Sequence, residues 1–227
     1  MSEIVLVVGA GAGLSAAVAR RFAKQGAQIA LAARHPDKLD GLAAELGARA
    51  YACDVTDRAA VDDMVAQVTA ELGLPDVVMF NPSARARGPF VELDPEAVKQ
   101  ALLVTCYGGY LVCNAVVPGM AARGSGTLLL TGASASVKGY AQSASFAMGK
   151  FGLRGLAQSL AREFQPQGLH IAHFVIDGAI RSASRPDDGS DALLDPAAIA
   201  ETYYQVTRQH RSAWSWEVEL RPWVETF

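Results

Sequence analysis

The segment "IVLVVGAGAGLS", Ile4 to Ser15, decides the fold. Its apolar run predicts a buried strand, and a helix-forming run follows directly after the glycines. Gly9 permits a sharp turn out of the strand, and the later glycines allow a ligand to approach the backbone. The helix that follows presents free N–H groups and the positive end of its dipole to a phosphate. We therefore predict a dinucleotide-binding turn here; the alternative is a tight turn without a ligand.

The same alternation of strand and helix continues along the chain. Apolar runs predict strands over residues 4–10, 28–34, 48–55, 75–83, 126–133 and 169–180. Amphipathic stretches between them predict helices, of which the longest cover 94–124 and 145–168. This order predicts a doubly wound parallel sheet, a Rossmann fold in three α/β/α layers. The chain has 227 residues, which suits one domain over 1–227, with a polar substrate loop over about 181–200.

The composition excludes several classes of partner. A net charge of −3 provides no basic field for nucleic acid or for an anionic membrane. The apolar runs are too short to span a bilayer, and the N-terminus lacks the basic region of a signal peptide. The three cysteines and four histidines show no metal-ligand spacing, so we predict no metal site. We expect a cytoplasmic protein that acts on a small molecule, with neither nucleic acid nor membrane as partner.

Short motifs spread over nearly the whole chain resemble the short-chain dehydrogenase/reductase family. Gly9 and Gly13 are separated by three residues, as in that family's glycine turn, and Ser15 stands where its third glycine usually lies. "CDVTD" matches the family's adenine-contacting pair, "NPSA" its "NNAG" segment, and "IDGAIRS" its segment beside the nicotinamide, with Asp177 in place of proline. Lys150 matches the lysine of the YxxxK motif. The resemblance implies a nicotinamide dinucleotide bound by Gly9, Ala10, Gly11, Ala12, Gly13, Leu14, Arg34, Asp54, Val55, Asn81, Lys150, Gly178, Ile180 and Ser182.

The end of the second predicted strand indicates which dinucleotide binds. An NAD site usually has an acid there for the ribose hydroxyl, whereas this chain has Ala33 followed by Arg34. An arginine can pair with a 2′-phosphate through its planar fork. We predict NADP(H) over NAD(H); the alternative is that Arg34 is a solvated surface charge.

The family's catalytic positions are mostly altered. The resemblance implies a tetrad of Asn, Ser, Tyr and Lys, of which only Lys150 is retained without ambiguity. Phe146 occupies the tyrosine position, Thr105 the asparagine position, and Ala133 the serine position with Ser134 next to it. A phenyl ring has no proton to give, so the usual mechanism cannot run through position 146.

Three explanations remain open. Another group supplies the proton, with Tyr140, Ser134, Tyr107 and water as candidates. Alternatively, the substrate needs no strong acid, as with an activated double bond or an iminium. Otherwise, the chain binds NADP without turning it over. We predict an atypical NADP(H)-dependent oxidoreductase of a small organic substrate, with a catalytically silent sensor or partner subunit as the alternative.

Two further features concern substrate and assembly. Arg181 and Arg185 in the predicted loop either attract an acidic substrate or are solvated. Aromatic residues crowd the C-terminal segment and either line a pocket or lie in a subunit interface: Tyr203, Tyr204, Trp214, Trp216 and Trp223. The resemblance implies a homodimer or homotetramer built on the two long helices and the C-terminal strand.

Overall fold

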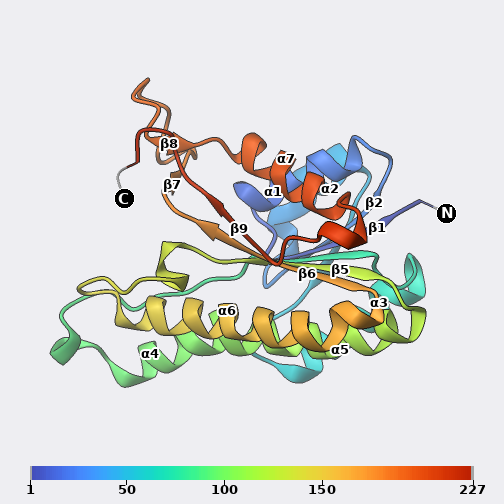
Figure 1. The fold of residues 1–227 in the computed structure, drawn as a ribbon, viewed down its shortest axis with the longest axis horizontal. Helices are drawn as coiled ribbons and strands as arrows, with labels where there is room; N and C mark the ends of the chain where they lie inside the picture. The colour runs from blue at the N-terminus through green and yellow to red at the C-terminus, as the bar shows by residue number, and fades with distance from the viewer. Residues whose placement is uncertain (1, 226–227) are drawn as a thin grey trace.

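A computed structural model describes residues 2–225 of the chain. Seven parallel strands form one sheet in the order β3-β2-β1-β4-β5-β6-β9 (Figure 1). The strands are β1 (Ile4–Val8), β2 (Gln28–Ala33), β3 (Arg49–Ala52), β4 (Val77–Phe80), β5 (Gly126–Thr131), β6 (Leu169–Ile176) and β9 (Glu217–Leu220). The strand order reverses between β1 and β4, so the prediction of a doubly wound sheet is confirmed.

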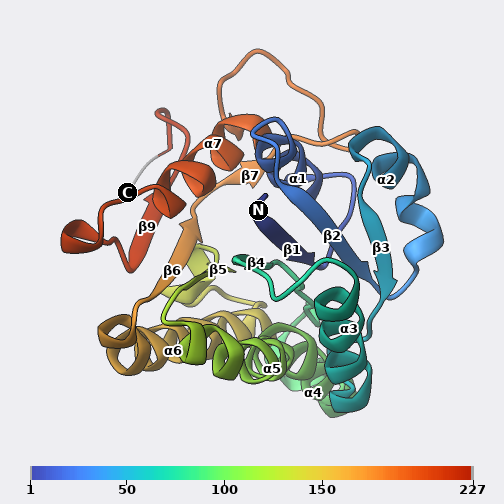
Figure 2. The same cartoon turned by 90° about the vertical axis from the view of Figure 1, so that its right-hand side faces the viewer.

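Helices cover both faces of the sheet, as the end-on view in Figure 2 shows. On one face lie α1 (Leu14–Ala23), α2 (Asp40–Leu46) and α7 (Pro196–Thr207). On the other lie α3 (Arg58–Glu71), α4 (Pro95–Leu102), α5 (Gly108–Arg123) and α6 (Ala144–Phe164). The central strands are apolar throughout because both faces are buried, and two hydrophobic clusters fill the two interlayer spaces.

The predicted helix over 94–124 is continuous but contains a π-helical turn. Asp94 caps its start by accepting the N–H of Glu96, and Leu103–Tyr107 form the π turn between α4 and α5. Over Pro95–Arg123 an 18-residue window has a mean hydropathy of 1.5, which would suit a membrane span by length and composition. Half of that window is buried inside the protein, and a core helix of a soluble protein passes the same test. The prediction that every apolar stretch is too short to cross a bilayer is therefore wrong for Pro95–Arg123, which meets the criterion by length and composition.

The C-terminal third differs most from the expectation. The sixth strand ends at Ile176, not at residue 180, and the chain turns at Gly178 with a φ of +154°. A two-stranded ribbon follows, made of β7 (Ala179–Ile180) and β8 (Leu193–Leu194). The irregular loop then ends at Asp195, whose carboxylate caps the unpredicted helix α7. Seven residues of the expected loop, about 181–200, therefore belong to β8 and α7, namely 193–194 and 196–200.

Candidate functional site

The glycine turn between β1 and α1 has the shape that a phosphate group requires. Gly9 has a φ of +78°, and a Cβ there would lie 2.8 Å from Pro82, so the position needs glycine. A Cβ on Gly11 or Gly13 would meet no atom within 4 Å, so the space in front of the turn is open. Gly13 caps α1 without any side-chain hydrogen bond. The helix N-terminus is therefore available to an anion.

Ser15 fastens the glycine turn to the neighbouring strand. Its hydroxyl donates to the carbonyl oxygen of Gly9 at 2.9 Å and accepts from the side-chain amide of Asn81 at 2.8 Å. Asn81 follows β4, and its backbone N–H binds the carbonyl of Val8 at 3.0 Å. A serine in place of a third glycine thus adds a hydrogen bond that holds the turn in position.

A hollow of about 610 Å³ lies beside the glycine turn, at the ends of β2 and β3. Asp54 lies at its wall, where its carboxylate accepts hydrogen bonds from the backbone N–H and the hydroxyl of Thr56 at 2.9 and 2.8 Å. These bonds, the backbone one foremost, hold the pKa of Asp54 below its usual value. Eight of the predicted cofactor residues line this hollow together: Gly9, Ala10, Gly11, Ala12, Arg34, Asp54, Val55 and Asn81.

Positive charge gathers at one side of the same hollow. Arg34 is exposed at the end of β2, and the sequence reasoning missed two neighbours, His35 and Lys38, that also line the hollow. Neither Arg34 nor Lys38 forms an ion pair with any residue among 2–225. The sequence "ARHPDK" could have indicated His35 and Lys38, since it places three basic residues within five positions.

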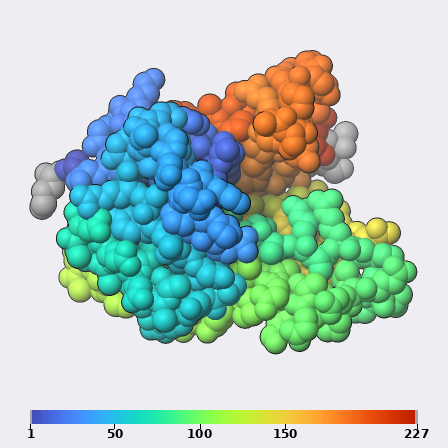
Figure 3. Space-filling model, turned by 180° about the vertical axis from the view of Figure 1, so that it is seen from behind, coloured from blue at the N-terminus to red at the C-terminus, as the bar shows by residue number. Residues whose placement is uncertain are grey.

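A second hollow of about 540 Å³ continues from the glycine turn across the carboxyl ends of β4, β5 and β6. It shares Asn81 and Ser83 with the first hollow. Figure 3 shows a depression on this side of the molecule, between the orange loop near residue 185 and the green segment near residue 90. Ligands of doubly wound sheets bind at this edge.

Lys150 is the buried charge of the second hollow. Its side chain is only 3% exposed, and Nζ donates to the carbonyl oxygen of Thr131 at 2.6 Å. Burial, together with the nearby charge of Arg85, lowers the pKa of Lys150 to about 7. Tyr203 supports this wall from below, because its hydroxyl donates to Oγ1 of Thr131 at 3.0 Å.

Phe146 lies one turn before Lys150 on α6 and faces the same hollow. The Arg85 guanidinium carbon lies 4.0 Å from the centroid of its ring, and Lys150 Nζ lies 5.9 Å from it. No tyrosine, aspartate or glutamate occurs among the described residues that line this hollow. Ser134 lines it at the start of the turn Ser134–Ser136.

Three predicted catalytic candidates lie elsewhere. Thr105 is fully buried outside the hollow, and its hydroxyl binds both backbone groups of Ala84, accepting at 3.0 Å and donating at 3.3 Å. Tyr140 is 46% exposed on the loop before α6, with Lys138 near its ring. Tyr107 is exposed on the outer helical face. None of the three lines the second hollow, because Thr105 turns toward its loop partner and both tyrosines turn toward solvent.

The segment after β6 supplies the far wall of the second hollow. Gly178, Ile180 and Ser182, which were predicted to bind the cofactor, line it together with Arg181 and Arg185. Arg181 is neutralised by ion pairs with Asp187 at 2.9 Å and Asp195 at 2.6 Å. None of the C-terminal aromatics lines it, and Trp223 is 83% exposed.

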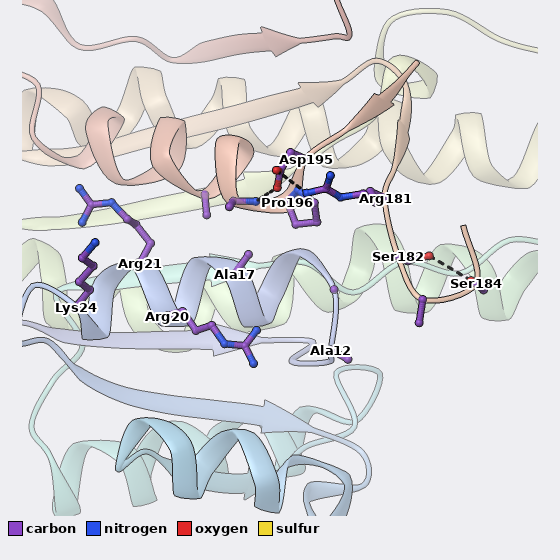
Figure 4. Close-up of a pocket in the computed structure, with 14 residues that line it drawn as sticks. Ala12, Ala17, Arg20, Arg21, Lys24, Arg181, Ser182, Ser184, Asp195 and Pro196 are labelled. Carbon is purple, nitrogen blue, oxygen red and sulfur yellow. Dashed lines mark hydrogen bonds and ion pairs between the residues drawn. The ribbon is translucent and has the colours of Figure 1, made fainter. Parts of the chain in front are cut away.

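A third cavity of about 790 Å³ lies between α1 and the start of α7 (Figure 4). Arg20 on α1 is bound by Glu45, and Arg21 by Glu201. Figure 4 shows Arg181 reaching toward Asp195 at the opposite wall. Most of its charges are therefore satisfied within the chain. Within residues 2–225, no cluster of histidine, cysteine or acidic side chains could hold a metal ion.

Comparisons with known proteins agree with this geometry. The family model described as short chain dehydrogenase matches residues 3–189. A short-chain dehydrogenase structure from Rhodopseudomonas palustris has 32% sequence identity and a TM-score of 0.85, covering 97% of this chain and 99% of that one. A metagenomic short-chain oxidoreductase in complex with NADP has 25% identity and a TM-score of 0.86, covering 98% of each chain. The (2S)-[(R)-hydroxy(phenyl)methyl]succinyl-CoA dehydrogenase subunit BbsC of Thauera aromatica is 33% identical over 189 residues, 81% of this chain and 75% of the relative.

Proposed function

The chain belongs to the short-chain dehydrogenase family of nucleotide-binding oxidoreductases, and from this premise we propose that it binds NADP(H) and acts on a small organic substrate with an unusual proton donor. One observation carries the proposal. The open glycine turn and the buried ammonium of Lys150 lie in hollows that meet at Asn81 and Ser83. A dinucleotide reaching from one hollow to the other would occupy both.

The residues present fit NADP(H). The free N-terminus of α1 would hold the pyrophosphate, and Asp54 would meet the adenine. Arg34 and Lys38 would pair with a 2′-phosphate. Ala33 stands where NAD sites usually have the carboxylate that binds the ribose 2′-hydroxyl. A structural relative crystallised with NADP supports the same choice. We therefore keep NADP(H) as the preferred cofactor over NAD(H).

Lys150 and Ser134 are the groups that we assign to the chemistry. When bound, the nicotinamide would supply or accept a hydride. Ser134 would hold the substrate oxygen, since it lines the hollow and its hydroxyl forms no hydrogen bond with any described residue. Lys150 would hold the ribose and also release the proton, because a pKa of about 7 lets the ammonium exchange a proton at neutral pH. Tyr140 and Tyr107 have no part in this proposal.

The missing phenol has a measurable consequence. A positioned proton donor typically contributes about 10²–10⁴ in rate, so simple ketones should turn over slowly. Substrates that need a weak acid, such as enones and iminium ions, should turn over faster. The test is NADPH and NADH titration by fluorescence, followed by a screen of carbonyls, enones and imines for NADPH oxidation. Absence of NADPH binding would refute the proposal at its first step.

The catalytically silent alternative has its own support. Phe146 removes the usual acid, and the relative BbsC is named as a subunit of a dehydrogenase. The Phe146→Tyr variant separates the two readings. If the wild type binds NADPH but oxidises none of the screened compounds, while the variant gains carbonyl reduction, the chain is a silent binding protein or partner subunit.

We further propose that the chain forms a homodimer or homotetramer in the cytoplasm. Four large apolar side chains are exposed on the helices α5 and α6 and the π turn between α4 and α5: Tyr107, Tyr110, Met148 and Phe151. A second copy that covered this face would remove them from water. Light scattering on purified protein tests the assembly.

A further inference from the structure

The second hollow contains an uncompensated group of cations. Arg85, Arg87, Arg185 and Lys150 all line it, and Arg181 is the only lining arginine that a described carboxylate neutralises. The side chains of Arg85, Arg87 and Arg185 form no ion pair or hydrogen bond with any residue among 2–225. The charges of Arg87 and Arg185 lie close enough to add to desolvation in lowering the pKa of Arg85.

Two buried hydroxyls hold the backbone on either side of Arg85. Oγ1 of Thr105 binds the N–H and the carbonyl of Ala84, and Oγ of Ser145 binds those of Ala86, both at 2.9 Å. Backbone groups at alternate positions are thus tied to the helical layer. Their neighbours Arg85 and Arg87 line the hollow.

Arg85 is also placed against the reaction centre. Its guanidinium carbon lies over the ring of Phe146, 4.0 Å from the centroid, and its N–H groups form no hydrogen bond with any described residue. A guanidinium edge matches the two oxygens of a carboxylate or a phosphate. Phe146, which removes the phenol, therefore also provides the platform on which this arginine rests.

We infer that the substrate is an anion, and that Arg85, with Arg87 and Arg185, binds its carboxylate or phosphate group next to Ser134 and Lys150. This inference rests on the proposed function, because it assigns the substrate class of the same site. The anionic group lies on the Phe146 side of the hollow, and the reacting carbon lies toward Lys150. Arg85 is the specificity-determining residue, since it is the arginine in contact with Phe146.

The test uses matched pairs of anion and neutral analogue. Calorimetric titration of the protein–NADP⁺ complex compares acetoacetate with methyl acetoacetate, and dihydroxyacetone phosphate with dihydroxyacetone. The variants are Arg85→Gln and, as a matched control, Arg162→Gln near the other end of α6. Among residues 2–225 the Arg162 guanidinium binds only the carbonyl of Gln158. NADPH oxidation with the same compounds gives KM and kcat where turnover occurs.

The expected result is that one anion binds at least tenfold tighter than its neutral partner. Arg85→Gln should raise Kd or KM for that anion by about tenfold, the scale of one charge-assisted hydrogen bond, and leave NADPH affinity within about twofold. Arg162→Gln should change neither. The pair in which the anion binds more tightly shows whether the anionic group of the substrate is a carboxylate or a phosphate.

Several outcomes would overturn the inference. Equal affinities for the anion and its neutral partner in both pairs would contradict the inference that the substrate is an anion. An equal loss of NADPH and anion affinity in Arg85→Gln would assign the arginines to the cofactor instead. Failure of the wild type to bind NADPH would overturn the proposed function and the inference with it. Anion binding without turnover would uphold the inference and favour the silent reading.

Discussion

Replacing Lys150 with methionine should make the ligand-free protein more stable at low pH, although it should abolish turnover. The lysine is 3% exposed, and its pKa falls from 10.5 to about 7, chiefly because burial penalises the ammonium. Methionine has a similar unbranched shape and no charge, so it fills the same space without that penalty.

The pH dependence follows from proton linkage. Below about pH 7 Lys150 is charged in the folded and unfolded states alike, so folding carries the full penalty. Between about 7 and 10.5 the unfolded state binds a proton that the folded state has released, so the penalty is relieved as pH rises. A shift of this size corresponds to about 5 kcal/mol as an upper bound. The lost hydrogen bond to Thr131 offsets about 1 kcal/mol, so a net stabilisation of about 2–4 kcal/mol is expected.

Urea unfolding of Lys150→Met and wild type, at about pH 6 and about pH 9.5, measures the effect as a difference between the two proteins. Protein concentration must be held constant, because any oligomer would otherwise shift the apparent stability. The difference should be largest at the lower pH and should nearly vanish at the higher one. Destabilisation at pH 6, or a difference that does not change with pH, would refute the view of Lys150 as a desolvated cation.

Three further changes probe the site and its supports. Arg34→Ser should raise Kd for NADPH by about tenfold and leave Kd for NADH unchanged, because NADH has no 2′-phosphate for Arg34 to bind. Fluorescence titration measures both constants, and an equal change in both would mean that no 2′-phosphate binds there. Gly9→Ala should cost about 1–3 kcal/mol in thermal unfolding and abolish NADPH binding, because its Cβ would lie 2.8 Å from Pro82 at a φ of +78°; retained binding would contradict this. Ser145→Ala should destabilise the fold by about 1–3 kcal/mol, since both backbone groups of Ala86 lose their partner; an unchanged midpoint in urea would show that water replaces the hydroxyl.

The parts of the fold that the sequence predicted are those with local signals. Five apolar residues before Gly9 predict β1, because a strand buried on both faces needs no alternation. Asp94 and Pro95 mark the start of a long helix. The same signals were present and overlooked at α7, where Asp195 caps, Pro196 follows, and Ile199, Tyr203 and Val206 recur at helical spacing.

The site depends more on contacts between distant residues, which local patterns do not reveal. Arg85 lines the hollow, and Thr105 and Ser145, 21 and 59 residues from their partners, hold the backbone on either side of it. The resemblance placed Thr105 at the family's asparagine position, but its hydroxyl is turned toward Ala84. No periodicity in "SARAR" distinguishes this arrangement from a solvated loop.

The cations that line the second hollow repel one another, and this repulsion links the cofactor site to the substrate site. Arg85 lowers the pKa of Lys150, and Arg87 and Arg185 lower that of Arg85, so each cation makes the others less favourable in the ligand-free protein. A structural role for these side chains would require a carboxylate nearby, and none lines the hollow among the described residues. The anions that would relieve this repulsion must come from outside the chain. A dinucleotide pyrophosphate at the glycine turn and an anionic substrate over Phe146 would each do so. Together they would raise the pKa of Lys150 toward its usual value, so that Lys150 takes up a proton as the site fills.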